Sequence, residues 1–358
     1  MEQAGGAAGW KAGTRRLSGA CPRKGCAAWR GLEGEEAKMN PIVQRIYEIG
    51  IVPVIAIEDV EKAVPLAKAL VAGGLPAAEV TFRTDAAEEA IRRIVKEVPE
   101  MLVGAGTVLT KDQVDRALDA GSQFIVSPGF NPEITRYALD KGALMMPGTA
   151  TPGEMEQAMS MGLDVVKFFP AEQNGGVAKL KAVAGPYRNL RWMPTGGVNA
   201  KNLMDYLSFD KIVACGGTWM VKKDLIDAGN FDEIERLTRE AVNTMLGFEL
   251  KHIGIDNGSA EEASALADLF NKMFGFAKDQ RSKSVFSSSA FELMHGKSPI
   301  GTHGHIAIAT NSVERAIAHL KMRGVEFDES TRTEKNGKTN FIYLKNAYAG
   351  FGIHLVQK

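Results

Sequence analysis

Short apolar runs alternate with amphipathic helical stretches over residues 51–247, and this alternation restricts the possible folds more than any other feature. Eight runs recur at intervals of 20 to 27 residues. They are VPVIAI (52–57), AAEVTF (77–82), LVGAGTV (102–108), QFIVSP (123–128), ALMMPG (143–148), DVVKFFP (164–170), RWMPTGG (191–197) and KIVACGG (211–217). Nearly continuous hydrophobic strands separated by helices are typical of parallel strands buried on both faces. Eight β/α units in about 200 residues predict a compact (β/α)8 TIM barrel over 39–247.

The pattern changes at Phe248 to a strand, a helix and several polar strands, and this succession occurs twice. KHIGID and the helix from Ser259 to Gly275 are echoed by GHIAIAT and the helix from Ser312 to Gly324. An internal duplication predicts that residues 248–358 form an α+β domain of two βαβββ modules. The linker after the barrel's last helix is short, so we expect the two domains to pack together.

Residues 1–38 are rich in glycine and basic residues and have no periodic apolar pattern, which indicates a disordered or artefactual tail. Cys21 and Cys26 could form a metal or disulfide pair, although two ligands alone do not make a zinc site. Met39 precedes the first segment with a helical pattern, so it is an alternative translation start.

The charge balance excludes several kinds of partner. The chain has 43 Lys and Arg against 43 Asp and Glu, whereas binding to nucleic acid or to a membrane surface needs a surplus of positive charge. Three cysteines in 358 residues cannot make a disulfide framework, and no apolar stretch approaches the roughly 20 residues that span a bilayer. We therefore expect a soluble cytoplasmic protein that acts on a small molecule.

Polar side chains near the C-terminal ends of the strands are the candidates for chemistry, because the reacting groups of such barrels gather there. Lys167 lies between valines and phenylalanines, where an ammonium is costly to desolvate, and a neutral lysine is a nucleophile towards a ketone. The alternative is a lysine that reaches solvent at a strand end. Glu79 lies within a strand and is either a proton carrier or the partner of Arg83 in a buried ion pair.

Further candidates for substrate binding follow the same strand ends. A guanidinium at Arg83 could grip a carboxylate or phosphate at two points, and Thr107 and Pro128 could shape the pocket. The seventh and eighth strands end in paired glycines, which let backbone N–H groups approach an anion closely. These positions are Gly196, Gly197, Gly216 and Gly217, followed by Thr218. Together they predict a phosphorylated substrate.

Seven motifs carry a resemblance to a known family. GIVPVIAIEDVEKAVPLAKALVAGG, EVTFRT, GAGTVL, SPGF, VKFFPAE, PTGGV and GGTWMV resemble the 2-keto-3-deoxy-6-phosphogluconate (KDPG) aldolases, a family that includes the 4-hydroxy-2-oxoglutarate (KHG) aldolases. The resemblance covers about residues 40–245 in order and in spacing. It implies a Schiff-base aldolase that needs no metal cofactor, is usually a homotrimer, and releases pyruvate from a 2-keto-4-hydroxy acid.

Position by position, the resemblance implies that Lys167 is the Schiff-base lysine and Glu79 the general acid/base. The family's substrate contacts match Arg83, Thr107 and Pro128, and its phosphate cradle matches Gly196, Gly197 and Thr218. Thr218 stands where members of the family often have serine, and it keeps the hydroxyl. The motifs leave the substrate open among KDPG, its galactonate epimer and unphosphorylated 4-hydroxy-2-oxoglutarate.

The duplicated C-terminal region resembles the vicinal oxygen chelate superfamily, which includes glyoxalases and ring-cleaving dioxygenases. The first and last strands of each module supply the metal ligands there, and His252, Glu292, His305 and His354 match those positions. The superfamily commonly has glutamate at the fourth position. The resemblance implies a divalent metal such as Zn, Ni, Co, Mn or Fe.

Two interpretations of the C-terminal region stay open from the sequence. It could isomerise or lyse a related oxo acid at a bound metal, or it could be a non-catalytic module for binding or oligomerisation. All six histidines lie beyond residue 250, and the three outside the metal pattern, His295, His303 and His319, are expected on the surface.

Overall fold

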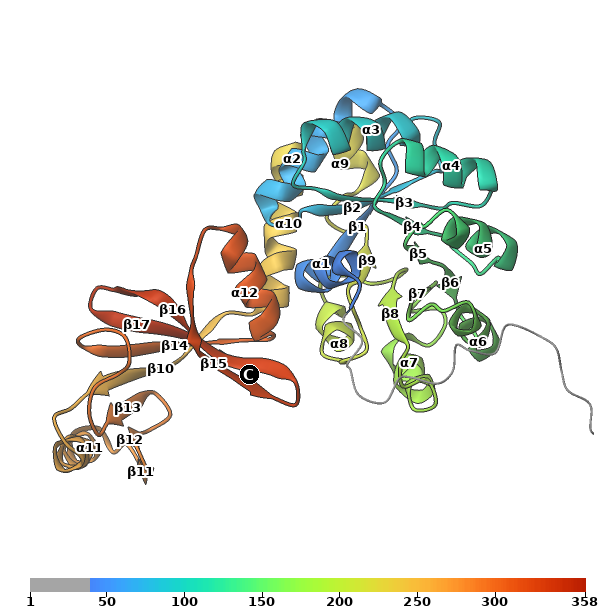
Figure 1. Ribbon diagram of the computed structural model, residues 1–358. Helices are drawn as coiled ribbons and strands as arrows, with labels where there is room; N and C mark the ends of the chain where they lie inside the picture. The colour runs from blue at the N-terminus through green and yellow to red at the C-terminus, as the bar shows by residue number, and fades with distance from the viewer. Residues whose placement is uncertain (1–38) are drawn as a thin grey trace, which may run out of the picture. The chain divides into compact units, whose positions relative to one another are not determined.

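Buried parallel strands surrounded by helices make up the chain from Pro41 to Leu246 in the computed structural model, which describes residues 39–358 (Figure 1). The strands are β1 (Ile51–Ile55), β2 (Ala77–Thr81), β3 (Leu102–Gly106), β4 (Phe124–Val126), β5 (Met145–Met146), β6 (Gly148–Thr149), β7 (Val165–Phe168), β8 (Arg191–Pro194) and β9 (Cys215–Gly217). The helices are α1 (Pro41–Ile49), the 3-10 helix η1 (Val60–Lys62), α2 (Ala63–Gly73), α3 (Ala87–Glu97), α4 (Lys111–Asp119), α5 (Pro132–Asp140), α6 (Pro152–Ser160), α7 (Gly176–Ala184), α8 (Leu203–Leu207), α9 (Lys223–Asp227) and α10 (Phe231–Leu246). We call residues 40–247 the barrel.

The barrel strands pair in parallel and in chain order. β1 to β5 form one run, β6 to β8 form another, and β9 pairs back onto β1. Isolated bridges Trp192–Ile212 and Thr195–Gly216 join β8 to the segment around β9. The prediction of a TIM-barrel-like (β/α) fold is therefore confirmed. The fifth apolar run differs from the prediction, because Pro147, which has no N–H to donate, separates β5 from β6.

Residues 248–358 form one eight-stranded sheet and two helices, which we call the C-terminal sheet. In chain order the elements are β10 (Glu249–Asp256), α11 (Ala260–Phe274), β11 (Lys278–Gln280), β12 (Ser284–Ser287), β13 (Phe291–Met294), β14 (Gly304–Thr310), α12 (Val313–Met322), β15 (Phe327–Lys335), β16 (Lys338–Tyr348) and β17 (Phe351–Gln357). The strand order in space is β11-β12-β13-β10-β14-β17-β16-β15. The two halves meet where β10 pairs antiparallel with β14, so the predicted ligand strands β13, β10, β14 and β17 are neighbours at the centre.

The two helices of the C-terminal sheet begin directly after Ser259 and Ser312, the residues at which the sequence predicts their start. The hydroxyl of Ser259 accepts from the N–H of Glu262 at the start of α11, and that of Ser312 accepts from the N–H of Arg315 at the start of α12. Capping satisfies N–H groups that have no partner inside the helix. Residues Ala263, Ala267, Val285 and Leu293 form a small core between α11 and the sheet.

Helix α12 packs against the barrel. The Tyr47 hydroxyl of α1 donates to Glu314 Oε2 at 2.7 Å, and His319 Nε2 lies 3.2 Å from the carbonyl oxygen of Ile49. Thr310 Oγ1 donates to the Leu246 carbonyl at 2.6 Å. Residues 40–358 accordingly form one compact unit, which agrees with the expectation that the two regions pack together.

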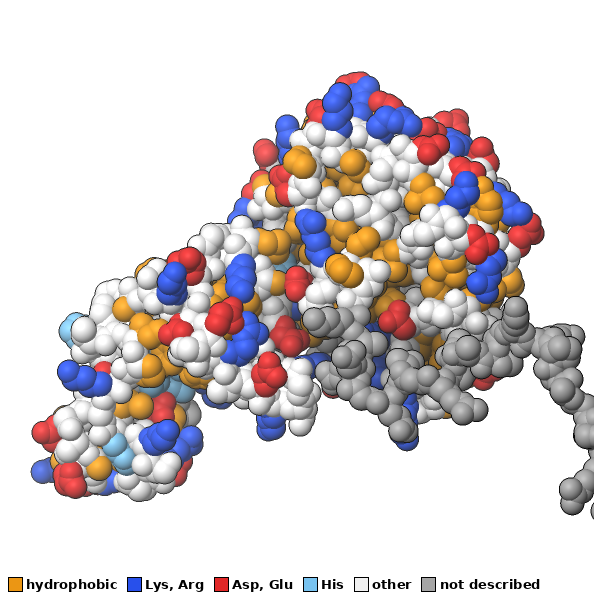
Figure 2. Space-filling model, viewed as in Figure 1, with side chains coloured by type: hydrophobic (Ala, Val, Ile, Leu, Met, Phe, Trp, Pro, Cys, Tyr) orange, Lys and Arg blue, Asp and Glu red, His pale blue; other side chains and the backbone are white. Residues whose placement is uncertain are grey.

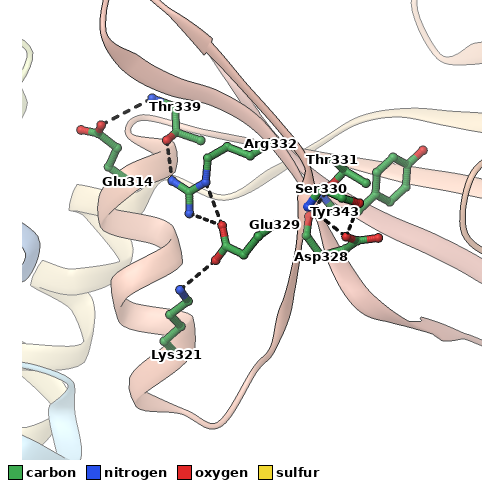
Figure 3. A network of polar contacts seen from close by, with 9 residues as sticks. All are labelled: Glu314, Lys321, Asp328, Glu329, Ser330, Thr331, Arg332, Thr339 and Tyr343. Carbon is green, nitrogen blue, oxygen red and sulfur yellow. Dashed lines mark hydrogen bonds and ion pairs between the residues drawn. The ribbon is translucent and has the colours of Figure 1, made fainter.

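A polar network connects α12 to the β15–β16 hairpin (Figure 3). Glu314 accepts from the N–H of Thr339, and the Thr339 hydroxyl accepts from Arg332 Nη1 at 2.8 Å. Glu329 pairs with both Arg332 and Lys321. These contacts cross the irregular stretch of β15 between Asp328 and Thr333, and they hold the bulged strand against α12.

Acidic and basic side chains are interspersed over the face of the molecule shown in Figure 2, in keeping with the balanced composition. Within the described residues, no helix has both the length and the apolar character needed to cross a membrane. The predictions for the tail, including the pair Cys21 and Cys26, lie outside the described residues.

Candidate active site and candidate metal centre

Lys167 and Glu79 meet inside the barrel. Lys167 lies on β7 and Glu79 on β2, and only 6% and 0% of their side chains are exposed. Lys167 Nζ lies 3.1 Å from Glu79 Oε1 and 3.4 Å from Oε2, so the two groups form a buried ion pair. Nζ also lies 5.3 Å from the centroid of the Phe169 ring, within range of a cation–π interaction. The structure thus brings the predicted nucleophile next to the predicted proton carrier, and the alternative of a solvent-reaching lysine is wrong.

A glycine on the neighbouring strand leaves room for the Glu79 carboxylate. A Cβ atom at Gly106 on β3 would lie 2.3 Å from Glu79 Oε1, so a side chain at this position would displace the carboxylate. Arg83, the alternative partner of Glu79, is exposed, and its Nε donates to Thr81 Oγ1 at 3.0 Å. The alternative of an ion pair between Glu79 and Arg83 is wrong, because Glu79 pairs with Lys167 instead.

The three residues predicted to contact substrate follow the C-terminal ends of β2, β3 and β4. Arg83 is exposed, while Thr107 and Pro128 are half-buried. Thr107 has a φ of 56°, a left-handed conformation that is uncommon for a β-branched residue. Strained backbone of this kind clusters at functional sites, so the Thr107 conformation supports a role in the pocket.

The glycines after β8 and in β9 lie next to each other, because Thr195 bridges to Gly216. Gly196 and Gly197 have φ values of 97° and 80°, which only glycine adopts readily. A Cβ atom at Gly216 would lie 2.3 Å from Thr195 Oγ1. The chain therefore has closely spaced, bare backbone at the place where the sequence predicts a phosphate, and Thr218 is exposed directly after β9.

Two features beside these glycines were not predicted from the sequence. Thr195 Oγ1 is buried and has no hydrogen-bond partner among the described residues. The Tyr206 hydroxyl donates to Glu172, whose Cγ would lie 2.5 Å from a Cβ at Gly197. No local sequence motif indicates either feature, because both depend on which loops the barrel brings together.

The four predicted metal ligands converge on one face of the C-terminal sheet. Glu292 Oε2 lies 3.0 Å from His252 Nε2 and 3.2 Å from His305 Nε2, and the two imidazole nitrogens are 3.2 Å apart. A His354 nitrogen lies within 4.8 Å of donor nitrogens of both other histidines. Three atoms from three strands thus form a nearly equilateral triangle, with His354 beside it.

The register of the sheet explains this convergence. Glu292 and His305 both pair with Gly254, and His252 and His354 both pair with Ala307, so the ligands flank two small residues. Residues opposite one another in a sheet share a face, which places all four side chains on the same side. A Cβ atom at Gly254 would lie 2.1 Å from the His305 ring, so only glycine admits the imidazole there.

The surroundings of the ligands favour a cation. Burial raises the pKa of Glu292, but the neighbouring side chains of His252, His305 and Ser284 outweigh it and hold the pKa of that carboxyl well below its usual range. His354 is buried, and its Nδ1 has no hydrogen-bond partner in the part of the chain that the structure describes.

One expectation about the remaining histidines is wrong. His303 is exposed and His295 half-buried, but His319 has only 1% of its surface exposed. It lies on the face of α12 that contacts α1, where burial lowers its pKa to about 4. The sequence misled here because a lone histidine on a helix carries no sign of which domain covers it.

A parallel (β/α) barrel with a buried lysine beside a carboxylate has the groups that an enzyme needs to form a Schiff base with a carbonyl substrate. The family model described as "KDPG and KHG aldolase" matches residues 42–237. The chain belongs to this aldolase family.

Relatives with known names agree with this assignment. A 2-dehydro-3-deoxy-phosphogluconate aldolase of Haemophilus influenzae is 47% identical over 202 residues, which are 56% of this chain and 95% of the relative. A KHG/KDPG aldolase of Escherichia coli K12 is 48% identical over 192 residues, or 54% of this chain and 90% of the relative. The prediction of an aldolase is confirmed.

Solved structures show the same fold. The KDPG aldolase of Legionella pneumophila, with pyruvate captured as a covalent carbinolamine, is 36% identical with a TM-score of 0.54, covering 56% of this chain and 97% of the other. The KDPG aldolase of Zymomonas mobilis ZM4, solved with 3-phosphoglycerate, is 41% identical with a TM-score of 0.53, covering 56% and 94%.

Proposed function

We propose that the barrel cleaves KDPG to pyruvate and glyceraldehyde 3-phosphate, or 4-hydroxy-2-oxoglutarate to pyruvate and glyoxylate, or both. The observation that carries the proposal is the buried pair of Lys167 Nζ and Glu79 Oε1, 3.1 Å apart. A nucleophilic amine with a proton carrier at hydrogen-bond distance suits both steps of Schiff-base chemistry.

The reaction follows from these two groups. Transfer of a proton to Glu79 frees the Lys167 amine, which attacks the C2 ketone to give a carbinolamine. Glu79 returns this proton to the carbinolamine hydroxyl, which leaves as water, and a protonated imine and the Glu79 carboxylate remain. Glu79 then takes the proton of the C4 hydroxyl, directly or through a water. The C3–C4 bond breaks to release an aldehyde, and its electron pair moves into the imine to form an enamine. Protonation at C3 and hydrolysis release pyruvate and restore Lys167.

The residues around this pair support a proposal for the remaining substrate contacts. We place the substrate carboxylate near Arg83, Thr107 and Pro128, and the phosphate against the bare backbone around Gly196 and Gly216. Backbone N–H groups bind an anion without the cost of ordering side chains. The active assembly is proposed to be a homotrimer, as the family resemblance implies, and light scattering of the purified protein measures it directly.

Borohydride trapping tests the mechanism. With pyruvate and borohydride, the wild type should gain a stable adduct at Lys167, and Lys167→Ala should gain none. Glu79→Gln should still trap pyruvate but lose about 10²–10⁴-fold in the rate of cleavage, because only the proton transfers are impaired. Persistent labelling of Lys167→Ala would overturn the assignment. A coupled pyruvate-release assay over KDPG, its galactonate epimer and 4-hydroxy-2-oxoglutarate identifies the substrate.

We propose, secondly, that residues 248–358 form a vicinal-oxygen-chelate-like domain of two βαβββ modules that binds a divalent metal. The donor triangle of His252, Glu292 and His305 supports this, with edges of 3.0 to 3.2 Å. Two ligands at right angles around an ion with bonds of about 2.1 Å lie about 3.0 Å apart. His354 would supply a fourth donor.

These donors fit a borderline metal such as Zn, Ni, Co, Mn or Fe, because imidazole and carboxylate suit all of them. When bound, the metal would act as a Lewis acid for an oxo acid. The chain's own residues hold the four donors in place and limit access of water through the burial of His305 and His354.

Metal analysis separates this function from a non-catalytic binding or oligomerisation module. The purified wild type should retain about one divalent metal per chain, and the His252→Ala, Glu292→Ala double variant should retain none. Retention of no metal by the wild type would favour the non-catalytic alternative. Pyruvate release should be unaffected by chelator in either case, because Lys167 and Glu79 need no metal.

A further inference from the structure

A buried serine and a half-buried aspartate lie behind His305, on the Nδ1 side of the ring. Ser298 belongs to the loop between β13 and β14 and is only 6% exposed, and Asp256 ends β10. Ser298 Oγ lies 2.7 Å from Asp256 Oδ1 and 3.0 Å from His305 Nδ1. The three groups form a chain, Asp256–Ser298–His305, which none of the functions above uses.

The single proton of the Ser298 hydroxyl must point to Asp256. Asp256 Oδ1 already accepts the backbone N–H of Ser298 at 2.9 Å, so this oxygen acts as an acceptor. The 2.7 Å contact between Ser298 Oγ and Oδ1 is then a hydrogen bond that the hydroxyl donates. Ser298 Oγ then has only lone pairs left for the contact with His305, so it accepts a hydrogen bond that His305 Nδ1 donates.

A proton on Nδ1 decides what the other nitrogen can do. In a neutral imidazole with Nδ1–H, Nε2 is a bare lone pair. His305 Nε2 points at Glu292 Oε2, 3.2 Å away, which is also an acceptor. Two acceptors at this distance repel unless a proton or a metal cation lies between them, and in the neutral Nδ1–H tautomer that place is left to the metal.

Steric contact fixes the plane of the same ring. Gly254, opposite His305 across the β10–β14 pair, leaves the space that the imidazole occupies. The ring is therefore held at its face by Gly254 and at its edge by Ser298. Among the described histidines of the donor set, His305 is the one whose Nδ1 has a hydrogen-bond partner, whereas Nδ1 of His354 has none.

We propose that Asp256 and Ser298 are positioning residues that set His305 in the Nδ1–H tautomer, ready to ligate a divalent metal through Nε2. The inference rests on the proposed metal site. Outer partners of a ligating histidine orient the ring, and their loss typically costs about 10–100-fold in metal affinity.

The tautomer is measurable without metal. Magic-angle-spinning NMR of the metal-free full chain, labelled with ¹⁵N-histidine, should show His305 with Nδ1 protonated and Nε2 bare. The chain has only six histidines, and the resonance lost in His305→Gln identifies the one concerned. A wild-type His305 protonated at Nε2 alone would overturn the inference.

Zn²⁺ affinity provides the second readout, by competition with a chelating dye. Ser298→Ala should weaken binding about 10–100-fold. Asp256→Ala should weaken Zn²⁺ binding to a similar extent, although the serine remains. Without Asp256 the Ser298 hydroxyl can donate to His305 Nδ1, which favours the tautomer with the proton on Nε2. Ser287→Ala is the matched control: Ser287 is fully buried in β12, and its hydroxyl has no partner within the described chain. Its affinity should stay within about twofold of the wild type.

The outcomes distinguish a failure of the positioning role of Asp256 and Ser298 from a failure of the proposed metal site. Wild-type affinity in both Ser298→Ala and Asp256→Ala would refute positioning while leaving the metal site intact. A wild type that binds Zn²⁺ no better than the His252→Ala, Glu292→Ala variant would refute the metal function, and the NMR measurement would still decide the tautomer. Melting curves of each variant check that the fold is retained.

Discussion

Replacement of Arg315 by methionine should loosen the contact between α12 and the barrel. Arg315 is 4% exposed, and its hydrogen bonds go to three barrel carbonyls: Nε donates to Tyr47 O at 3.0 Å, and Nη2 to Val213 O at 3.3 Å and Ile212 O at 3.5 Å. No described carboxylate pairs with it. Methionine keeps most of the volume and removes every donor.

The magnitude follows from the groups left behind. A buried acceptor that loses its partner costs about 1–3 kcal/mol. This cost applies in full to Tyr47 O, which accepts the shortest of the three hydrogen bonds, at 3.0 Å. The two contacts of Nη2 are long, at 3.3 and 3.5 Å, so together we count them as about one further bond. Loss of the guanidinium over the Tyr47 ring, 4.6 Å from its centroid, adds about 1 kcal/mol. Relief from burying a cation, whose pKa burial lowers, offsets part of this sum. We expect a loss of about 3 kcal/mol in the free energy of unfolding.

Urea unfolding followed by tryptophan fluorescence measures this loss, since Trp192 and Trp219 lie in the barrel and no tryptophan lies beyond residue 247. Arg323→Met is the control, because Arg323 is exposed at the end of the same helix. It should change stability by less than about 0.5 kcal/mol. If Arg315→Met were no less stable than Arg323→Met, the three carbonyls would have to find water, and the reasoning would be refuted.

Three further predictions concern single sites. Gly216→Ala should raise the KM for KDPG about 10–100-fold and leave the KM for 4-hydroxy-2-oxoglutarate nearly unchanged, because the new Cβ would press on Thr195 Oγ1 beside the proposed phosphate contact. Gly153→Ala is the control, since a Cβ there meets no atom within 4 Å. An equal rise in KM for both substrates would contradict the placement of the phosphate. Gly254→Ala should abolish metal retention, measured by elemental analysis, whereas Gly296→Ala should keep it, since a Cβ meets the His305 ring only at the former. The pKa of His319 is about 4 in the folded protein and 6.5 in the unfolded chain, so the unfolded chain binds the proton first as the pH falls. The free energy of unfolding should therefore be independent of His319 above pH 6.5 and should decrease by about 3 kcal/mol between pH 6.5 and pH 4. Urea midpoints of His319→Gln should fall less steeply with pH than those of the wild type, with a remaining slope from His354, whose pKa burial lowers to about 3. The exposed His303→Gln should keep the wild-type slope, and an unchanged slope in His319→Gln would place the proton elsewhere.

Much of the barrel could be predicted from the sequence because its strands are buried on both faces. Burial on both sides requires unbroken apolar runs, and these mark the strands directly. The division of the fifth strand at Pro147 was missed, although the proline is visible, because the run around it is as apolar as the others. In the C-terminal region the sequence located both helices, because each begins at a capping serine, Ser259 or Ser312.

The residue types at the two candidate sites were also determined by the sequence: a lysine and a glutamate in apolar strands, and histidines at matching positions of a repeat. Their partners were decided only by the tertiary structure. Nothing local indicates that Glu79 pairs with Lys167 and not with Arg83, that Ser298 stands behind His305, or that α12 buries His319 and Arg315 on the barrel. Hydrogen bonds and ion pairs act over about 3 Å, and the distance between two side chains far apart in the chain exists only once the strands are in register.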